Sequence, residues 1–334
     1  MDSMAFDRGR ASVKVLVTGG AGFIGSNLVR CLAASGESVR VLDDLSSGTL
    51  GNLEGVSGLV DVMVAPLADV EAVRRTVDGA EIIYHLAGPR DAHRSPRASE
   101  DERQELPGVL NLLKAASAGS VRRFVYASSA SVYGGSPRLP TREDAPVIAS
   151  DGAAASKLTC EDYCRAFSRL YGLQSIGLRF FEVFGPREAP SGSTSTVTRF
   201  LSAMLRGRPP VIFGGGAQVH DFVYVANAVQ ALVLATACPD GAYGEVVNIG
   251  SGKGMSLLQL INEINTLLGT SIAPIFGIPH EEDLTSSQAD IAGARRLLHY
   301  EPLVSFERGL AESASWLVGS MSARPEAKEH LIAI

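Results

Sequence analysis

A glycine-rich turn, TGGAGFIG at residues 18–25, constrains the fold of this chain more than any other feature. The apolar, β-branched run Val13–Val17 precedes the turn, and a helical pattern over Phe23–Ala34 follows it. The next strand-like run, Ser38–Leu42, ends at the acid Asp43. Strand, glycine turn, helix and second strand together predict a β-α-β unit of about 30 residues.

The glycine spacing indicates what this unit binds. Gly19, Gly22 and Gly25 recur every third residue. Small residues there let the backbone approach a pyrophosphate, whose charge is met by N–H groups at the helix N-terminus. Asp43 and its neighbour Asp44 supply carboxylates that accept hydrogen bonds from a ribose diol and repel a 2′-phosphate. An ordinary tight turn needs none of these flanking features, so we expect a dinucleotide site that takes NAD rather than NADP.

Strands and helices continue to alternate along the first half of the chain. Strand-like or helical patterns occupy residues 61–65, 71–77, 82–86 and 123–128, with a further helix that ends near Ala116. Strands without polar alternation, separated by helices, indicate a parallel sheet covered on both faces. We therefore predict an α/β protein with a Rossmann-type doubly wound sheet. Residues 1–185 form the NAD-binding domain, and residues 186–334 form a smaller, interleaved substrate domain with some segments that return to the sheet.

Charge and composition exclude several classes of protein. The formal net charge is −6 and no run of Lys or Arg stands out, so a nucleic-acid partner is not expected. The charged N-terminal segment lacks the apolar core of a signal peptide, and no stretch approaches the roughly 20 apolar residues of a membrane helix. Four cysteines without a CxxC pair predict reduced thiols and no metal site. We expect a cytoplasmic protein without a membrane or metal partner.

Further motifs follow one another along nearly the whole chain. They are VLVTGGAGFIGSNLV (15–29), HLA (85–87), FVYASSASVYG (124–134), SKL (156–158), RFFEVFGP (179–186), DFVYV (221–225), NIGSG (248–252) and QADI (288–291). In these motifs the chain resembles the extended short-chain dehydrogenase/reductase family, in particular its nucleotide-sugar epimerases and dehydratases, such as UDP-glucose 4-epimerases. The resemblance implies an NAD-dependent enzyme with its cleft between the two domains. It also implies a homodimer formed through two long helices, for which Leu112, Leu113, Phe167 and Leu170 have suitable spacing.

The resemblance assigns residues to three roles. It implies cofactor contacts from Gly19, Gly22, Phe23, Ile24, Gly25, Asp43, Asp44, Leu67, Leu86, Ala87 and Lys157. It implies substrate contacts from Ser129, Ser131, Glu182, Arg187, Arg199 and His220. Ser129 and Lys157 match the catalytic hydroxyl and lysine of the family.

One catalytic position departs from the family. Its chemistry depends on a Tyr-x-x-x-Lys pair, in which lysine and NAD lower the pKa of the tyrosine until it can act as a base. Four residues before Lys157 stands Ala153, whose methyl group takes no proton. Glu182 is the best alternative base because its segment lines the cleft, and Tyr133 is a second candidate that more often packs. His85 more often ends a strand without a catalytic role, and His93 and Arg94 receive none.

Other departures change the charge of the substrate half. The usual asparagine and arginine are replaced by Glu182 and His220, the late loop reads PHEED at 279–283, and Glu105 replaces a second asparagine. Several changes in one direction indicate natural divergence rather than an engineered change at Ala153. Arginine is suited to hold a diphosphate in a bidentate way, so its loss suggests a ligand that is less anionic or carries an amine. Arg187, Arg199 and Arg206 keep a conventional substrate open.

Three functions remain open from the sequence. The first is epimerisation of a UDP- or TDP-sugar by transient oxidation. The segment Ser129-Ala130-Ser131 favours it, because it lacks the Asp-Glu pair of the 4,6-dehydratases and the acid of the decarboxylases. The second is NAD-assisted isomerisation or elimination on a less anionic, non-nucleotide substrate. The third is a catalytically silent NAD-binding sensor.

Overall fold

The structure is a computed structural model that describes residues 14–88, 98–135, 138–188, 195–239, 242–279 and 285–322, with the side chains of residues 98–105 outside the description. Its centre is a seven-stranded sheet in the order β3-β2-β1-β4-β5-β6-β11, in which every neighbouring pair is parallel. The strands are β1 (Lys14–Thr18), β2 (Ser38–Asp43), β3 (Val60–Val64), β4 (Ile82–His85), β5 (Arg123–Ser129), β6 (Ser175–Phe180) and β11 (Val246–Ile249). This order confirms the Rossmann-type doubly wound sheet.

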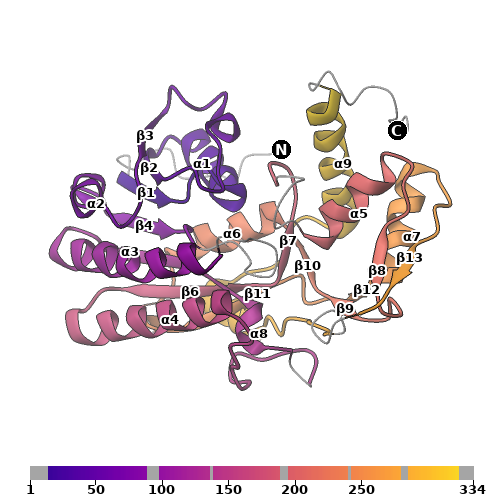
Figure 1. Cartoon of the computed structure of the whole chain (residues 1–334). Coiled ribbons are helices and arrows are strands. Elements are labelled where there is room, and N and C mark those ends of the chain that lie inside the picture. The colour runs from indigo at the N-terminus through magenta and orange to yellow at the C-terminus, as the bar shows by residue number, and fades with distance from the viewer. Residues whose placement is uncertain are drawn as a thin grey trace.

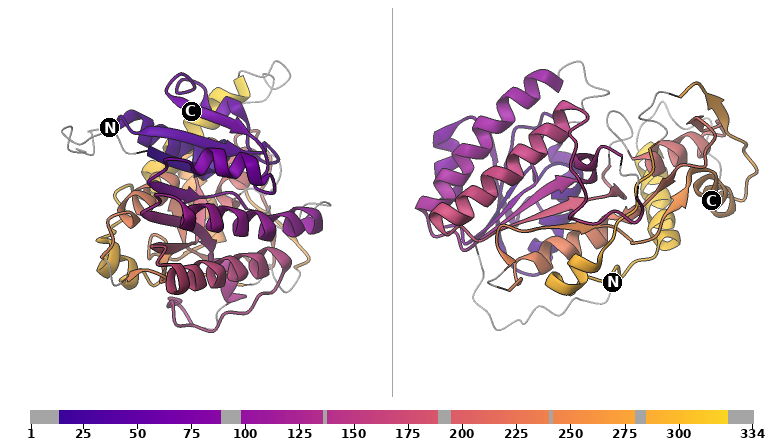
Figure 2. Two further views of the ribbon diagram at one scale, coloured as in Figure 1. Left: turned by 90° about the vertical axis from the view of Figure 1, so that its left-hand side faces the viewer. Right: turned by 90° about the horizontal axis from the view of Figure 1, so that it is seen from below.

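Helices cover both faces of the sheet (Figures 1 and 2). The strand period of two sends Val15 and Val17 into one core and Leu16 into the other. The first core also contains residues of α1 (Phe23–Ala34) and α6 (Val225–Ala235). The second contains residues of α2 (Val70–Val77), α3 (Ala98–Ala118) and α4 (Gly152–Tyr171). Two independent cores on opposite faces fix the strand ends, where the glycine turn lies.

Local signals placed most of these elements correctly. The helix expected at Phe23–Ala34 has those bounds, and the strand expected to begin at Ser38 extends to Asp43. Helix α4 begins at Gly152 because Asp151 caps it, with the Asp151 carboxylate accepting the Ala154 N–H at 2.7 Å. Ala153 therefore lies in the first turn of the helix that carries Lys157.

Smaller elements build the C-terminal part. Three two-stranded sheets pair β7 (Glu182–Phe184) with β10 (Phe222–Tyr224), β9 (Val219–His220) with β12 (Met255–Ser256), and β8 (Val211–Phe213) with β13 (Ile275–Gly277). The accompanying helices are α5 (Thr196–Met204), α7 (Leu257–Leu268), α8 (Ala292–Leu298) and α9 (Phe306–Ser322). Short 3-10 helices occupy Leu50–Leu53 and Ala130–Tyr133. Two-stranded sheets are marginal alone, so this part depends on its packing against the larger sheet. The division at residue 185 stays a prediction.

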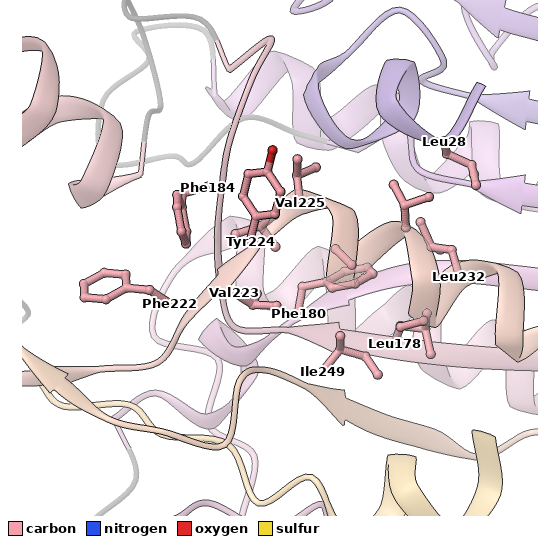
Figure 3. Packing of buried hydrophobic residues seen from close by; sticks show 14 of the residues in the cluster. Leu28, Leu178, Phe180, Phe184, Phe222, Val223, Tyr224, Val225, Leu232 and Ile249 are labelled. Carbon is pink, nitrogen blue, oxygen red and sulfur yellow. The ribbon is translucent and has the colours of Figure 1, made fainter. Parts of the chain in front are cut away.

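Aromatic side chains join the two parts (Figure 3). The ring centroid of Phe184 lies 5.6 Å from that of Tyr224 and 5.3 Å from that of Phe306. Phe180, at the end of β6, belongs to the same core. Rings at these separations gain attraction beyond the area that they bury. The chain after β6 is therefore held firmly, which positions Glu182 at the carboxyl edge of the sheet.

The two long helices expected at a dimer contact place their apolar residues differently. Leu112 and Leu113 are fully buried in the core of the chain itself, whereas Leu170 is 74% exposed. Phe167 is half-buried, and its ring centroid lies 4.9 Å from that of Tyr171, with the two rings tilted by 43°. Among the described residues, no helix is long and apolar enough to cross a membrane.

Candidate cofactor and substrate sites

A cavity of about 290 Å³ lies at the carboxyl ends of the first strands of the sheet. Parallel α/β sheets bind ligands at this edge. Its lining includes Gly19, Gly22, Phe23, Ile24, Gly25, Asp43, Asp44, Leu67, Leu86 and Ala87. The structure therefore brings together every residue that was assigned to the cofactor except Lys157, which lies on α4 outside this lining. Ser46, Ser47, Pro66 and Gly88 also line the cavity and were not singled out from the sequence.

The glycine turn leaves backbone where side chains would otherwise stand. A Cβ atom added at Gly25 would meet the Gly19 carbonyl oxygen at 2.0 Å, and Gly19 itself has φ +70°. The N-cap of α1 is Gly22, which has no side-chain acceptor for the first N–H groups of the helix. These groups remain directed at the cavity, where a helix N-terminus attracts an anion. The turn fits a dinucleotide pyrophosphate.

The acids at the end of β2 accept hydrogen bonds from backbone N–H groups of the glycine turn and of the loop after β2. Asp43 accepts the Ala21 N–H with Oδ2 at 2.8 Å and the Leu45 N–H with Oδ1 at 2.9 Å. Burial raises the pKa of Asp43, and these two hydrogen bonds oppose the rise. Asp44 is exposed and accepts the Ser46 N–H at 2.9 Å. Each carboxylate keeps further lone pairs for hydroxyl donors, so both fit a ribose diol.

Ser129 and Lys157 come from adjacent elements. Ser129 ends β5, opposite Phe180 of β6, and its Oγ accepts the Ser131 N–H at 3.1 Å. Ser131 is exposed in the following 3-10 helix. Lys157 is half-buried on α4, one helical turn beyond the buried Ala153. Ser129 and Lys157 therefore come from adjacent elements, and Ala153 presents only a methyl group one helical turn before Lys157.

A buried ion pair lies behind Ser129. Arg179 contacts Glu161 through Nη2–Oε2 at 2.7 Å and Nε–Oε1 at 2.9 Å, with both side chains at most 5% exposed. The Tyr133 hydroxyl accepts a hydrogen bond from Arg179 at 2.9 Å and donates to Asn248 at 2.7 Å. Burial raises the pKa of Tyr133, against the opposing effect of Arg179. This placement favours a packing role for Tyr133 over a catalytic one.

His85 is a buried histidine in contact with the neighbouring strand. Its Nδ1 lies 2.8 Å from the Thr18 hydroxyl, and the ring is 1% exposed. Thr18 and His85 are partners in the pairing of β1 with β4. The contact joins two strand ends beneath the cofactor cavity, which agrees with a structural histidine.

Glu182 and His220 form a partly exposed pair at the start of the substrate half. Glu182 Oε2 lies 3.3 Å from His220 Nδ1, and the two side chains are 20% and 21% exposed. Glu182 Oε1 accepts a hydrogen bond from the backbone N–H of Thr196 at 2.5 Å, and Thr196 is the first residue of α5. Desolvation opposes ionisation, but His220 and Thr196 outweigh it and lower the pKa of Glu182. Glu182 is therefore a carboxylate at neutral pH.

Glu188 completes this region and was not predicted from the sequence. It accepts the N–H of Ser195 and the Thr198 hydroxyl, and it accepts the Ser195 hydroxyl at 2.8 Å. Burial raises the pKa of Glu188 to about 7, with a contribution from Glu182 and against the opposing hydrogen bonds. Its one sequence signal is its place beside Arg187, directly after the Gly-Pro segment.

The arginines expected near the substrate make contacts within the chain. Arg187 donates to the Asn27 side chain of α1 at 3.2 Å, and Arg206 donates to the Ser202 carbonyl at 2.7 Å. Arg199 lies 3.4 Å from the Thr196 hydroxyl and lines a second cavity of about 470 Å³ with Phe200, Ala203, Pro209, Pro210, Val211 and Phe213. His93, Arg94, residues 280–283 and the side chain of Glu105 lie outside the described residues.

The chain belongs to the NAD dependent epimerase/dehydratase family, whose family model matches residues 15–250. The UDP-glucose 4-epimerase of Mycolicibacterium smegmatis is 36% identical over 309 residues, covering 91% of this chain and 98% of that protein. The solved UDP-glucose 4-epimerase of Thermotoga maritima with UDP-glucose has a TM-score of 0.86 and 33% identity, covering 92% of this chain and 99% of that one. The UDP-glucuronic acid 4-epimerase of Bacillus cereus, in complex with UDP-glucuronic acid and NAD, has a TM-score of 0.84 and 27% identity, covering 92% and 100%.

These similarities confirm the predicted family, the Rossmann-type fold, the NAD cofactor and the enzyme class. The glycine turn and the strand-end acids of this chain have the chemistry that this cofactor needs. The roles of individual residues stay predictions.

Proposed function

We propose that this chain is an NAD-dependent epimerase that inverts one carbon of a sugar by transient oxidation of its hydroxyl. The observation that carries the proposal is the retention of Lys157 and Ser129 beside a complete cofactor cradle. The nucleotide sugars in the names of its relatives are the reference class of substrate.

We assign a separate role to each residue of the site. Bound NAD supplies the hydride acceptor and donor. Ser129 lies at the end of β5 and positions the sugar hydroxyl, and the Lys157 ammonium group holds the cofactor ribose. Glu182 is the carboxylate that we carry forward as proton acceptor, because it is ionised and one-fifth exposed at the same sheet edge. The methyl group of Ala153 contributes no proton transfer.

Turnover of variants tests this proposal. UDP- and TDP-sugars are offered to the purified protein and inversion is followed by NMR. We expect Lys157→Met to lower turnover at least about 100-fold, because the cofactor ribose loses the group that positions it. Lys114→Met, the same change at an exposed lysine of α3, should leave it unchanged. Turnover by Ala153→Tyr alone would identify a silenced epimerase, and turnover that survives Lys157→Met would refute the proposed site.

A second candidate is supported by the pair of Glu182 and His220. Isomerisation or elimination on a less anionic, non-nucleotide substrate would keep NAD, Ser129 and Lys157 but would not need a cation at position 220. Product analysis by mass spectrometry separates the two, because elimination changes the mass of the sugar and epimerisation does not. A silent NAD-binding sensor would show neither change.

We also propose a homodimer formed through α3 and α4. Leu170 and Tyr171, at the C-terminal end of α4, are 74% and 63% exposed, which leaves apolar surface on that helix. Analytical ultracentrifugation tests the proposal. A dimer that dissociates in the variant Leu170→Asp supports it, and a monomeric wild-type protein contradicts it.

A further inference from the structure

The N-terminus of α5 is filled by carboxylates of the chain itself. Thr196 N–H donates to Glu182 and Ser195 N–H donates to Glu188. The N-cap hydroxyl of Ser195 accepts the Thr198 N–H at 3.2 Å and donates to Glu188 at 2.8 Å. Helix N-termini attract anions because their first N–H groups are unpaired and the dipole is positive there. Two glutamates therefore stand where an external anion would be held.

This helix end faces the region where the proposed chemistry takes place. Glu182 follows Phe180, the residue of β6 that is paired with Ser129. The Glu182 N–H donates to the Asp221 carbonyl at 3.1 Å, which fixes it beside His220, the residue that precedes Asp221. Both side chains of the Glu182–His220 pair keep about one-fifth of their surface exposed. A substrate that reaches Ser129 can thus meet this pair from the other side.

The charge of the cluster opposes a phosphate. Glu182 is ionised, and its charge contributes to the raised pKa of Glu188. His220 is the partner of Glu182, and the Arg199 guanidinium lies 3.4 Å from the Thr196 hydroxyl and 5.5 Å from the centroid of the Phe200 ring. A diphosphate placed here would add two negative charges beside the Glu182 carboxylate, and His220 is already paired with that carboxylate.

We infer that Glu182 and Glu188 are specificity-determining residues: they fill the anion position of α5 from within, so that the substrate presents a hydrogen-bond-donating hydroxyl or amino group, and not a phosphate, to the Glu182–His220 pair. The inference rests on the proposed function for the position of the substrate. It goes further because it states which functional group the substrate presents to the Glu182–His220 pair.

Binding of UDP to the NAD-loaded full-length protein tests this inference, with uridine as the uncharged probe. The variants are His220→Arg, Glu188→Gln and the double variant Glu182→Gln/His220→Arg. Glu245→Gln is the matched control, because Glu245 is exposed and precedes β11, at the amino-terminal end of that strand and away from the carboxyl ends where Glu182 lies. NAD content and circular dichroism establish that each variant is folded before titration.

We expect the wild-type protein and Glu245→Gln to bind UDP no more tightly than uridine. We expect the double variant to gain at least about tenfold in affinity for UDP without a gain for uridine, and His220→Arg a smaller share of it. Wild-type binding of UDP at least about tenfold tighter than uridine would overturn the inference. So would folded variants that gain nothing.

This outcome is independent of the proposed reaction. The titrations use no turnover, so a failed epimerase assay leaves them valid. Conversely, a wild-type protein that binds UDP tightly and epimerises UDP-sugars would overturn this inference and support the proposed function.

Discussion

Replacing Glu188 with glutamine should change how the stability of this protein depends on pH. Glu188 is 5% exposed, and burial raises its pKa from 4.5 to about 7. In the unfolded chain the carboxyl ionises near 4.5, whereas in the fold it keeps its proton until about pH 7. Unfolding between these values therefore releases a proton, and the free energy of unfolding falls as pH rises.

The size of the effect follows from the two pKa values. Each pKa unit corresponds to about 1.4 kcal/mol, so the interval from 4.5 to about 7 corresponds to about 3 kcal/mol of lost stability. Glutamine does not ionise and loses nothing over this interval. Its amide replaces one acceptor oxygen by a donor, which costs about 1–3 kcal/mol at every pH. This cost lowers the free energy of unfolding of the variant equally at every pH. The titration of Glu188 determines how the difference between the two proteins changes with pH.

Urea unfolding of both proteins, at steps across this pH interval, measures that slope. The free energy of unfolding of Glu188→Gln minus that of the wild-type protein should rise by about 3 kcal/mol from pH 4.5 to pH 7. Most other titrating groups are shared and cancel in the difference. In a Glu182→Gln background the rise should shrink, because Glu182 contributes to the raised pKa of Glu188. A difference that stays flat with pH would refute the reasoning.

Further predictions concern the cofactor cradle and the buried ion pair. Gly25→Ala should lower NAD affinity at least about 100-fold by forcing the turn open. Gly58→Ala, a control position with open space around it, should leave NAD affinity unchanged. Fluorescence titration with NAD measures the affinity of both variants. Arg179→Met should lower the free energy of unfolding by about 3–5 kcal/mol because it leaves Glu161 charged and buried. Arg142→Met, which breaks an ion pair whose side chains are 69% and 71% exposed, should leave the free energy of unfolding nearly unchanged in the same urea assay. Equal losses from the two arginine variants would contradict the assigned burial.

The cofactor half was predictable because its signals are local. The turn at residues 18–25, the helix that it starts and Asp43 lie within one β-α-β unit. Spacing alone therefore placed them at one cavity. The placement of Ala153 one turn before Lys157 was equally predictable, since both residues lie on one helix.

The substrate half depends on contacts between distant residues. Tyr133 is held by Arg179, 46 residues away, and by Asn248, 115 residues away. Glu188 becomes significant only when Ser195 and Thr198 surround it and Glu182 lies nearby. Periodicity reports which side chains are buried but not which partners meet them. The charge of this region was visible in the sequence, whereas its arrangement around the N-terminus of α5 was not.

Reduction of the bound NAD by a sugar tests the central claim most directly. The purified protein with its cofactor is mixed with UDP-sugars, amino sugars and uncharged sugars, and the near-ultraviolet absorbance of reduced nicotinamide is followed by stopped flow. We predict a transient rise with at least one sugar, its absence in Lys157→Met, and recovery of the oxidised cofactor as the inverted sugar appears. If NAD stays bound and oxidised with every sugar, in both the wild-type protein and Ala153→Tyr, this chain does not work by transient oxidation.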